Sequence, residues 1–129
     1  MKVVASGDRN WTDSVYVFAV FDALHAEHSI TKCAHGAARG VDTIVGEWAK
    51  SREIPCREYP AIWTVNGKFF KGAGHVRNIE MIDSEKPDLL VAIHPKLAES
   101  RGTKHAAYYA KSKGHQVLVC DGFTARELE

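Results

Sequence analysis

The sequence predicts an α/β fold, in which a five-stranded, mostly parallel sheet is flanked by helices on both faces. Five short apolar runs alternate with four segments whose apolar residues recur at helical spacing. Such alternation is typical of parallel strands joined by right-handed helical crossovers. The chain has 129 residues, the size of one ordinary domain. We therefore expect a single domain over residues 1–129, with residues 121–129 as a polar C-terminal tail.

The first expected elements are a strand, a helix and a second strand. Residues 2–6 form a short apolar run, which predicts a buried strand. The helix is expected over residues 13–28, where Thr12 or Asp13 is a candidate N-cap. Its apolar residues recur at helical spacing: Val17, Val20, Phe21 and Leu24. The second strand is expected over residues 30–35.

A second helix, a third strand and a long loop occupy the middle of the chain. The helix is expected over residues 41–51, with Trp48 on its apolar face and therefore in the core. The strand is expected over residues 55–59. Periodicity then disappears over residues 60–74, which mix aromatic, basic and glycine residues. Long loops in compact domains are often functional, and Trp63 lies in this one.

The remaining sequence continues the alternation. It predicts a helix, the most apolar strand of the chain, another helix and a last strand, over residues 76–84, 88–93, 102–113 and 116–120. Pro87 immediately precedes the apolar strand. Gly114 ends the helix expected over residues 102–113, since glycine tolerates the left-handed geometry common after a helix.

Composition and charge exclude several classes of protein. The formal net charge is +1, too balanced for a surface that binds nucleic acid nonspecifically, so any anion site must be local. No apolar run approaches the roughly 20 residues that span a bilayer. The N-terminal apolar run is far shorter than the core of a secretory signal, which predicts a cytoplasmic protein.

The cysteine and histidine patterns indicate neither a disulfide framework nor a metal centre. The cysteines, Cys33, Cys56 and Cys120, form no Cys-x-x-Cys pair, and each lies in or beside an apolar run where buried packing is expected. The histidines are dispersed; His25 and His28 share a helix but lack a carboxylate at ligand spacing. We expect no bound metal and no cofactor.

The segment from His35 to Asp42, His-Gly-Ala-Ala-Arg-Gly-Val-Asp, joins the second strand to the second helix. It is either a tight turn or a phosphate cradle, in which glycine backbone N–H groups, the helix N-terminus and Arg39 bind an anion. Residues 6–9 and 94–103 also follow strands. Ligands bind at the carboxyl ends of parallel strands, where these three loops should converge, and this favours the cradle.

Five motifs follow one another along the chain. They are Ser6-Gly7-Asp8-Arg9-Asn10-Trp11, the His35–Asp42 segment, Arg77-Asn78 with Met81, Pro87 to Ala92, and Ser100-Arg101-Gly102-Thr103. Together they resemble the YspA (cpYpsA-related) branch of the SLOG superfamily, over almost the entire chain. The resemblance implies a Rossmann-like fold, in a superfamily that includes cytokinin-activating phosphoribohydrolases, DNA-processing proteins and sensors of nucleotide-derived signals. It also implies a site for a nucleotide or related phosphorylated ligand, formed by Ser6, Gly7, Arg9, His35, Gly36, Arg39, Gly40, Asp42, Arg77, Asn78, Gly102 and Thr103.

Several of these residues have two expected roles. The glycines and the Thr103 hydroxyl suit phosphate oxygens at helix N-termini. Arg39 and Arg77 either hold phosphate through paired hydrogen bonds or make structural salt bridges. Asp42 either accepts hydrogen bonds from ribose hydroxyls or interacts with the helix dipole or Arg39. His35 either bonds a phosphate or caps the neighbouring backbone.

One departure from the superfamily concerns catalysis. The phosphoribohydrolase branch has the motif Pro-Gly-Gly-x-Gly-Thr-x-x-Glu, whose glutamate acts in cleaving the N-glycosidic bond. Here the segment is Glu-Ser-Arg-Gly-Thr-Lys-His-Ala, so Ala106 occupies the glutamate position. Without that carboxylate the known mechanism lacks its acid–base group, and no catalytic residue is assigned. Glu99, Asp8 or Asp42 would substitute only if the geometry allowed.

The sequence therefore predicts a protein that binds a nucleotide or nucleotide-derived phosphorylated ligand, of the AMP, ADP-ribose or NAD-derivative class, as a sensor, sequestering or accessory protein. Trp11 and Trp63 either stack on its base or pack against the domain. The alternative is a nucleotide phosphoribohydrolase or NAD-derivative hydrolase with a relocated catalytic acid. A nucleic-acid-associated protein is less favoured because the charge is balanced. Apolar helix faces and sheet edges leave room for a homodimer, and no membrane partner is expected.

Overall fold

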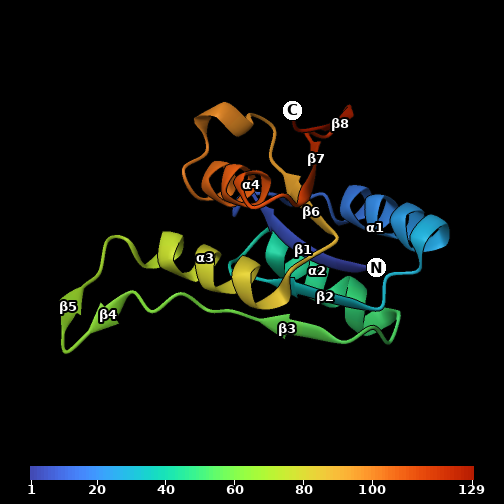
Figure 1. The fold of residues 1–129 in the computed structure, drawn as a ribbon. Helices are drawn as coiled ribbons and strands as arrows, with labels where there is room; N and C mark the ends of the chain where they lie inside the picture. The colour runs from blue at the N-terminus through green and yellow to red at the C-terminus, as the bar shows by residue number, and fades with distance from the viewer.

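The computed structural model describes residues 1–129 as a sheet with helices on both faces (Figure 1). Its elements are β1 (Lys2–Gly7), α1 (Ser14–His28), β2 (Lys32–His35), α2 (Val41–Ser51), β3 (Cys56–Glu58), β4 (Thr64–Val65), β5 (Lys68–Phe69), α3 (Ala73–Glu85), β6 (Leu89–Ile93), the 3-10 turn η1 (Leu97–Glu99), α4 (Gly102–Ser112), β7 (Gln116–Cys120) and β8 (Ala125–Glu127). The expected fold class is confirmed. None of the helices is long and apolar enough to cross a membrane.

The main sheet has six strands in the order β3-β2-β1-β6-β7-β8. The first five in this order pair in parallel, and β8 pairs antiparallel with β7. The chain runs outward from β1 through β2 to β3, then crosses to β6 on the other side of β1. The strand order therefore reverses between β1 and β6, which is the place where folds of this kind bind ligands.

The two faces of the sheet have separate hydrophobic cores. Val3 and Ala5 of β1 face α1 and α2, whereas Val4 faces α3 and α4. Trp48 is fully buried and packs on Phe21 with ring centroids 5.1 Å apart, which confirms its expected place in the core. Since side chains alternate along a strand, helices on both faces are required to bury these apolar strands.

The structure has one more strand in the main sheet than the sequence predicts. β8 lies within the segment expected to be a polar tail. It is only three residues long and all three are exposed, so it gives no apolar pattern to detect. It is held by β7 pairing and by the buried Leu128, whose N–H donates to the Val117 carbonyl at 2.9 Å. A short edge strand of this kind depends on its tertiary neighbours.

Part of the expected 60–74 loop is also ordered into elements. β4 and β5 form a hairpin around Asn66 and Gly67, a pair typical of two-residue turns, and this hairpin extends away from the main sheet (Figure 1). α3 begins at Ala73, three residues before the expected start. The glycines on either side of Ala73 disfavour helix and so conceal this first turn in the sequence.

A buried carboxylate joins α3 to the edge of the sheet. Glu85, only 5% exposed, accepts hydrogen bonds from Lys32 Nζ at 2.8 Å and from the Tyr59 hydroxyl. Burial acts to raise the pKa of Glu85, but the hydrogen bonds from Lys32 and Tyr59 outweigh burial and leave it lowered. The ionised form is therefore the one that stabilises the fold.

Replacing Glu85 with glutamine should lower the free energy of unfolding at neutral pH by about 1–3 kcal/mol. Because the folded-state pKa is lowered, the stabilisation is present above the unfolded pKa of about 4.3 and is lost as pH falls through the folded value. Urea denaturation of the wild type and Glu85→Gln across pH 3–7 checks this, with exposed Glu80→Gln on the same helix as control. A stability difference that does not narrow at acidic pH would contradict it.

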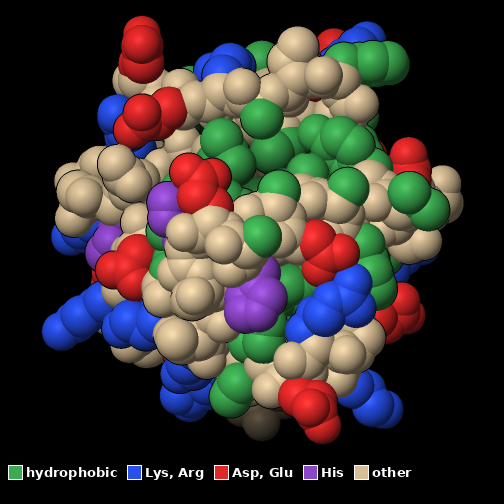
Figure 2. Space-filling view, turned by 90° about the vertical axis from the view of Figure 1, so that its right-hand side faces the viewer, with side chains coloured by type: hydrophobic (Ala, Val, Ile, Leu, Met, Phe, Trp, Pro, Cys, Tyr) green, Lys and Arg blue, Asp and Glu red, His purple; other side chains and the backbone are tan.

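The surface carries no dominant charge on the face seen in Figure 2. Acidic and basic side chains are interspersed there around a patch of hydrophobic side chains. This mixture agrees with the net charge of +1. A site that binds an anion must therefore depend on a local cluster of basic side chains and not on the charge of the whole surface.

Candidate functional site

The loops that follow β1, β2 and β6 meet at the carboxyl edge of the sheet. Together with the start of α3 and the hairpin, they line a cavity of about 550 Å³, here called the rim cavity. Seven of the predicted site residues line it: Ser6, Gly7, Arg9, Asp42, Arg77, Gly102 and Thr103. The predicted convergence of three loops is present, and it lies where the strand order reverses.

Three helices begin at the rim cavity. Residues in the first turns of α2, α3 and α4 all line it, including Asp42, His75 and Thr103. A helix N-terminus carries partial positive charge and backbone N–H groups without intrahelical partners. At α4, the N–H groups of Gly102 and Lys104 make no hydrogen bond in the structure. The arrangement is that of an anion site.

The side chains of the rim cavity add to this positive potential. Four lining residues are basic, namely Arg9, Lys71, Arg77 and Arg101. Two are acidic, Asp8 and Asp42. Although the whole chain is nearly neutral, the residues that line the rim cavity carry more basic than acidic side chains.

Arg77 is held in place by the loops that it contacts. Its Nη1 donates to the carbonyls of Gly36 and, at 3.3 Å, Tyr59, and its Nε donates to Asn78 Oδ1 at 2.9 Å. Burial lowers the pKa of Arg77, and the nearby Asp42 carboxylate opposes this effect. Its structural partners are thus neutral oxygens, so its positive charge is not cancelled by a direct ion pair.

Asp42 organises the loop that precedes α2. Its Oδ2 accepts hydrogen bonds from the N–H groups of Gly36 at 3.1 Å and Ala38 at 3.2 Å. Burial raises the pKa of Asp42. Its Oδ1 is also buried and has no hydrogen-bond partner. Arg39 does not pair with Asp42; it is exposed and makes one long hydrogen bond, of 3.5 Å, to Asn10.

Five predicted site residues do not line the rim cavity: His35, Gly36, Arg39, Gly40 and Asn78. Gly36 packs under Arg77, and Gly40 packs under the backbone of the β1–α1 loop. Asn78 is buried and donates to the Gly102 carbonyl at 3.1 Å, which fixes the start of α4 against α3. Gly36, Gly40 and Asn78 therefore contact elements that form the site without lining the cavity themselves.

His35 faces the opposite side of the sheet from Arg77. It is 3% exposed, and its Nδ1 accepts a hydrogen bond from the Ala37 N–H at 2.9 Å. This matches the backbone-capping role that was one of its two expected roles. Its Nε2 lies against Gly46 of α2. The alternation of side chains along β2 gives His35 the same face as Cys33.

Aromatic side chains stand at the mouth of the rim cavity. Trp63 stacks on Phe69 with ring centroids 6.0 Å apart, and the Arg9 guanidinium lies 6.0 Å from the Trp63 ring. His75 stacks on His105 at 3.9 Å. Trp11 instead packs on the nearby Tyr16, away from the cavity lining.

Several lining residues lie outside the five motifs and the predicted site, namely Phe69, Lys71, Gly74, His75 and His94. Asp8, Ser100 and Arg101 also line the cavity; they lie within the motifs but are not among the predicted site residues. Phe69 and Lys71 lie in the 60–74 loop, whose length and composition were the available signal. His75 lies in the first turn of α3, which begins earlier than the sequence predicts, so the sequence does not place His75 at a helix N-terminus.

The carboxylates bear on the question of catalysis. Ala106 is fully buried in the core between α4 and the sheet. Glu99 is exposed and does not line the rim cavity, whereas Asp8 and Asp42 do. No group of three His, Cys, Asp or Glu residues is placed to hold a metal ion.

Comparison with known proteins identifies one family, and solved structures with a similar fold include the two described below. A sequence model of the YspA, cpYpsA-related SLOG family matches residues 1–65. DNA processing protein A (DprA) from Streptococcus pneumoniae superimposes with a TM-score of 0.70 and 16% identity, over 92% of this chain and 49% of that chain. UDP-GlcNAc 2-epimerase from Neisseria meningitidis, bound to UDP-GlcNAc, gives a TM-score of 0.57 and 18% identity, over 92% and 32%.

This chain therefore spans less than half of the length of either structural neighbour. At these identities the two likenesses show a shared fold alone. No curated protein matches the sequence significantly.

Proposed function

Because the chain belongs to the YspA, cpYpsA-related SLOG family, we propose that its rim cavity binds a nucleotide or a nucleotide-derived phosphorylated ligand. Family membership suggests a nucleotide-related binding or processing role. The proposal narrows this role to binding, by a sensor, sequestering or accessory protein, of a ligand of the AMP, ADP-ribose or NAD-derivative class.

The observation that carries the proposal is the meeting of three helix N-termini at one cavity whose charged side chains are mostly basic. Unpaired N–H groups at Gly102 and Lys104 provide donors for phosphate oxygens. Arg77 provides a fixed guanidinium, and Arg9 and Arg101 are exposed cations beside it. A phosphate group suits this environment better than any neutral ligand does.

Two further features suit the remaining parts of a nucleotide. Asp42 lines the cavity and its buried Oδ1 has no donor, a need that a ribose hydroxyl would meet if the carboxylate turned toward the ligand. Trp63 and Phe69 present exposed aromatic rings at the mouth, where a base would stack. We assign phosphate to the α4 end of the cavity and the base to the hairpin end.

Gly102→Val tests the phosphate assignment. Gly102 lines the cavity and an added Cβ there meets no atom within 4 Å, so a side chain at this position has room beside the proposed phosphate site. Titration calorimetry against AMP, ADP-ribose, NAD and cyclic nucleotides should detect binding by the wild type. The variant should lose at least about tenfold in affinity, the equivalent of one charge-assisted contact.

Two controls make this result interpretable. Ala26→Val, at an exposed position on α1, should bind as the wild type does. Adenosine, which lacks phosphate, should bind at least about tenfold more weakly than AMP. Absence of binding to every nucleotide by folded wild-type protein would refute the proposal, as would equal affinity for AMP and adenosine.

The alternative function is hydrolysis of the bound nucleotide. It is favoured by the position of Asp42, which lines the rim cavity and has one carboxylate oxygen without a hydrogen-bond partner. Burial also raises the pKa of Asp42, as is common for general acids. Chromatography of each nucleotide after prolonged incubation with the protein separates the two functions. Product that forms in wild type and disappears in Asp42→Asn would support hydrolysis; unchanged nucleotide with measurable binding would support binding alone.

A further inference from the structure

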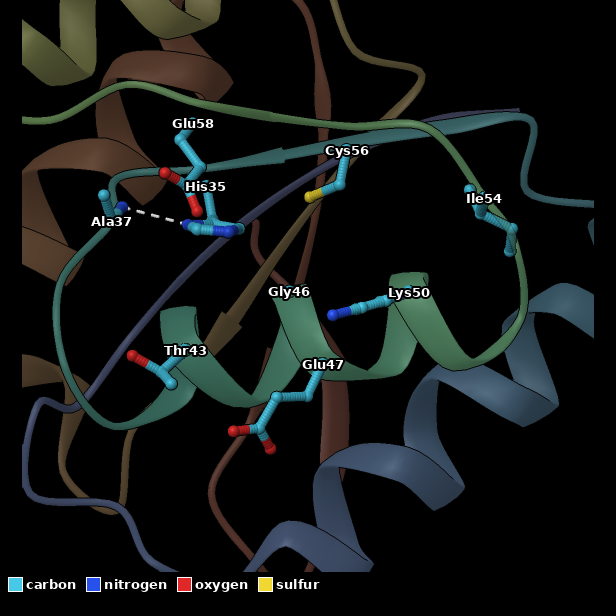
Figure 3. A pocket seen from close by; sticks show the side chains of 9 residues that line it. All are labelled: His35, Ala37, Thr43, Gly46, Glu47, Lys50, Ile54, Cys56 and Glu58. Atoms are coloured by element: carbon cyan, nitrogen blue, oxygen red, sulfur yellow. Dashed lines mark hydrogen bonds between the residues drawn. The ribbon is translucent and has the colours of Figure 1, made fainter.

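We propose that Cys56 and Cys33 form a hydroperoxide-reactive dithiol, in which the Cys56 thiolate reduces the peroxide and Cys33 then closes a disulfide between β2 and β3. The site is a second cavity of about 550 Å³ between α2 and the β2–β3 edge (Figure 3). It is separate from the rim cavity, and the proposal does not rest on the function proposed there. Its key residues are Cys56, His35, Lys50 and Glu58, and Cys33 lies opposite Cys56 in the strand pairing.

Cys56 is placed to react, because it lines this cavity and is half-buried rather than enclosed. Figure 3 shows its sulfur and the His35 ring on the same side of the cavity, with Lys50 entering from α2. The neighbouring Cys33 and His35 side chains lower the pKa of the Cys56 thiol, although burial and the nearby Glu58 carboxylate oppose them. Thiolates, rather than thiols, attack peroxides.

The tautomer of His35 supports this arrangement. The Ala37 N–H donates to Nδ1, so the proton of the neutral ring is on Nε2, the nitrogen directed toward the cavity. Burial acts to lower the pKa of His35, while the hydrogen bond and charge of Cys56 raise it and prevail. In either protonation state Nε2 bears a proton that stabilises the thiolate. His35 is therefore a positioning residue for Cys56.

Cys33 is the natural partner for closing a disulfide. It is directly opposite Cys56 in the parallel pairing of β2 with β3. Neighbouring strands lie about 4.8 Å apart, within the range of about 4.4–6.8 Å that Cα atoms span across a disulfide. The pKa of Cys33 is raised by its hydrogen bond with Cys56 and by burial. Loss of the Cys56 negative charge on oxidation would relieve part of that effect.

The reaction balances without another reductant. The Cys56 thiolate attacks one peroxide oxygen, the O–O bond breaks, and the departing alkoxide or hydroxide takes a proton from water. Sulfur is oxidised by two electrons to the sulfenic acid. Cys33 then loses its proton to solvent and attacks the Cys56 sulfur, so that the S–S bond forms, the S–O bond breaks, and hydroxide leaves as water. Two thiols and one hydroperoxide become a disulfide, an alcohol or water, and a further water.

Hydrogen peroxide, followed by intact-mass measurement and peptide mapping, tests the proposal. The wild type should lose two hydrogen atoms and yield a peptide linking Cys33 with Cys56. Cys33→Ser should stop at the Cys56 sulfenic acid, which dimedone traps. Cys120→Ser is the matched control and should behave as the wild type, because burial raises the pKa of Cys120 to about 11. Cys56→Ser should consume peroxide at least about tenfold more slowly.

The role of His35 has its own readout. In His35→Asn the pH at which iodoacetamide alkylates Cys56 at half its maximal rate should rise by about one unit or more. Cys120 is fully buried, so the free thiol of N-acetylcysteine in the same reaction serves as the reference. This measurement also covers the case in which Cys56→Ser does not fold, since the wild type alone should show Cys56 alkylated at lower pH than N-acetylcysteine.

Three results would overturn the proposal. They are equal peroxide consumption by wild type and folded Cys56→Ser, a disulfide that involves Cys120 or a second chain, and alkylation of Cys56 at no lower pH than N-acetylcysteine. Each would leave nucleotide binding at the rim cavity untouched.

Discussion

Replacing Gly40 with alanine is expected to lower the free energy of unfolding by about 2–5 kcal/mol, from backbone strain and overpacking together. Gly40 has a φ of +76° at the start of α2, which L side chains rarely adopt. An added Cβ would also overlap the carbonyl oxygen of Asp8 and the backbone of Arg9. The β1–α1 loop must then move away from α2, and this movement opens the rim cavity.

Gly114→Ala is the matched control for this effect. Gly114 also has a left-handed φ, of +87°, but an added Cβ there meets nothing within 4 Å. Its cost should be about 1 kcal/mol, from backbone strain alone. Chemical denaturation gives the free energy of unfolding of both variants, and the difference between their losses is the cost of the overlap with the β1–α1 loop. Equal losses in the two variants would show that the close packing under Asp8 contributes nothing.

Arg77→Ala should affect stability and ligand affinity together. Its guanidinium joins the Gly36 and Tyr59 carbonyls, and removal leaves both acceptors without this donor. We expect a loss of about 2–3 kcal/mol in the free energy of unfolding. We also expect a fall of about 10–100-fold in nucleotide affinity, because the same side chain lines the rim cavity.

Arg101→Ala separates the two effects. Arg101 also lines the rim cavity, but it is exposed and makes no side-chain hydrogen bond. Its replacement should weaken nucleotide binding without changing the unfolding midpoint. Calorimetric titration and thermal unfolding of both variants are the measurements. An Arg77→Ala protein that binds AMP as tightly as the wild type would remove Arg77 from the proposed site.

Much of this architecture could be predicted from the sequence because parallel topology places strand ends together. The segments after β1, β2 and β6 carry glycine, serine and arginine, and their convergence follows from the alternation of strands and helices. The hydrogen-bond partners of each side chain could not be predicted from the sequence. Arg77 was expected to hold phosphate or an acidic group, yet it binds two carbonyls supplied by loops far away in sequence.

The direction of His35 could have been deduced in part. Cys33 and His35 are two residues apart on one strand, so they share a face that Ala34 does not. The motif groups His35 with the glycines that follow it, whereas the two-residue period of the strand places its side chain with Cys33. The β8 strand, by contrast, has no apolar pattern, and only its contacts with β7 order it.

One residue separates two chemically different compartments of this protein. The backbone after His35 leads into the loop whose amides Asp42 fixes beside the rim cavity, while its imidazole faces Cys56. The bond from Ala37 to Nδ1 ties the ring to that loop. Thermodynamic linkage makes such a connection reciprocal. If nucleotide binding at the rim cavity changes the free energy of thiol oxidation, then thiol oxidation changes the free energy of nucleotide binding by the same amount. Nucleotide affinity and the thiol reduction potential are therefore the pair of quantities to measure together.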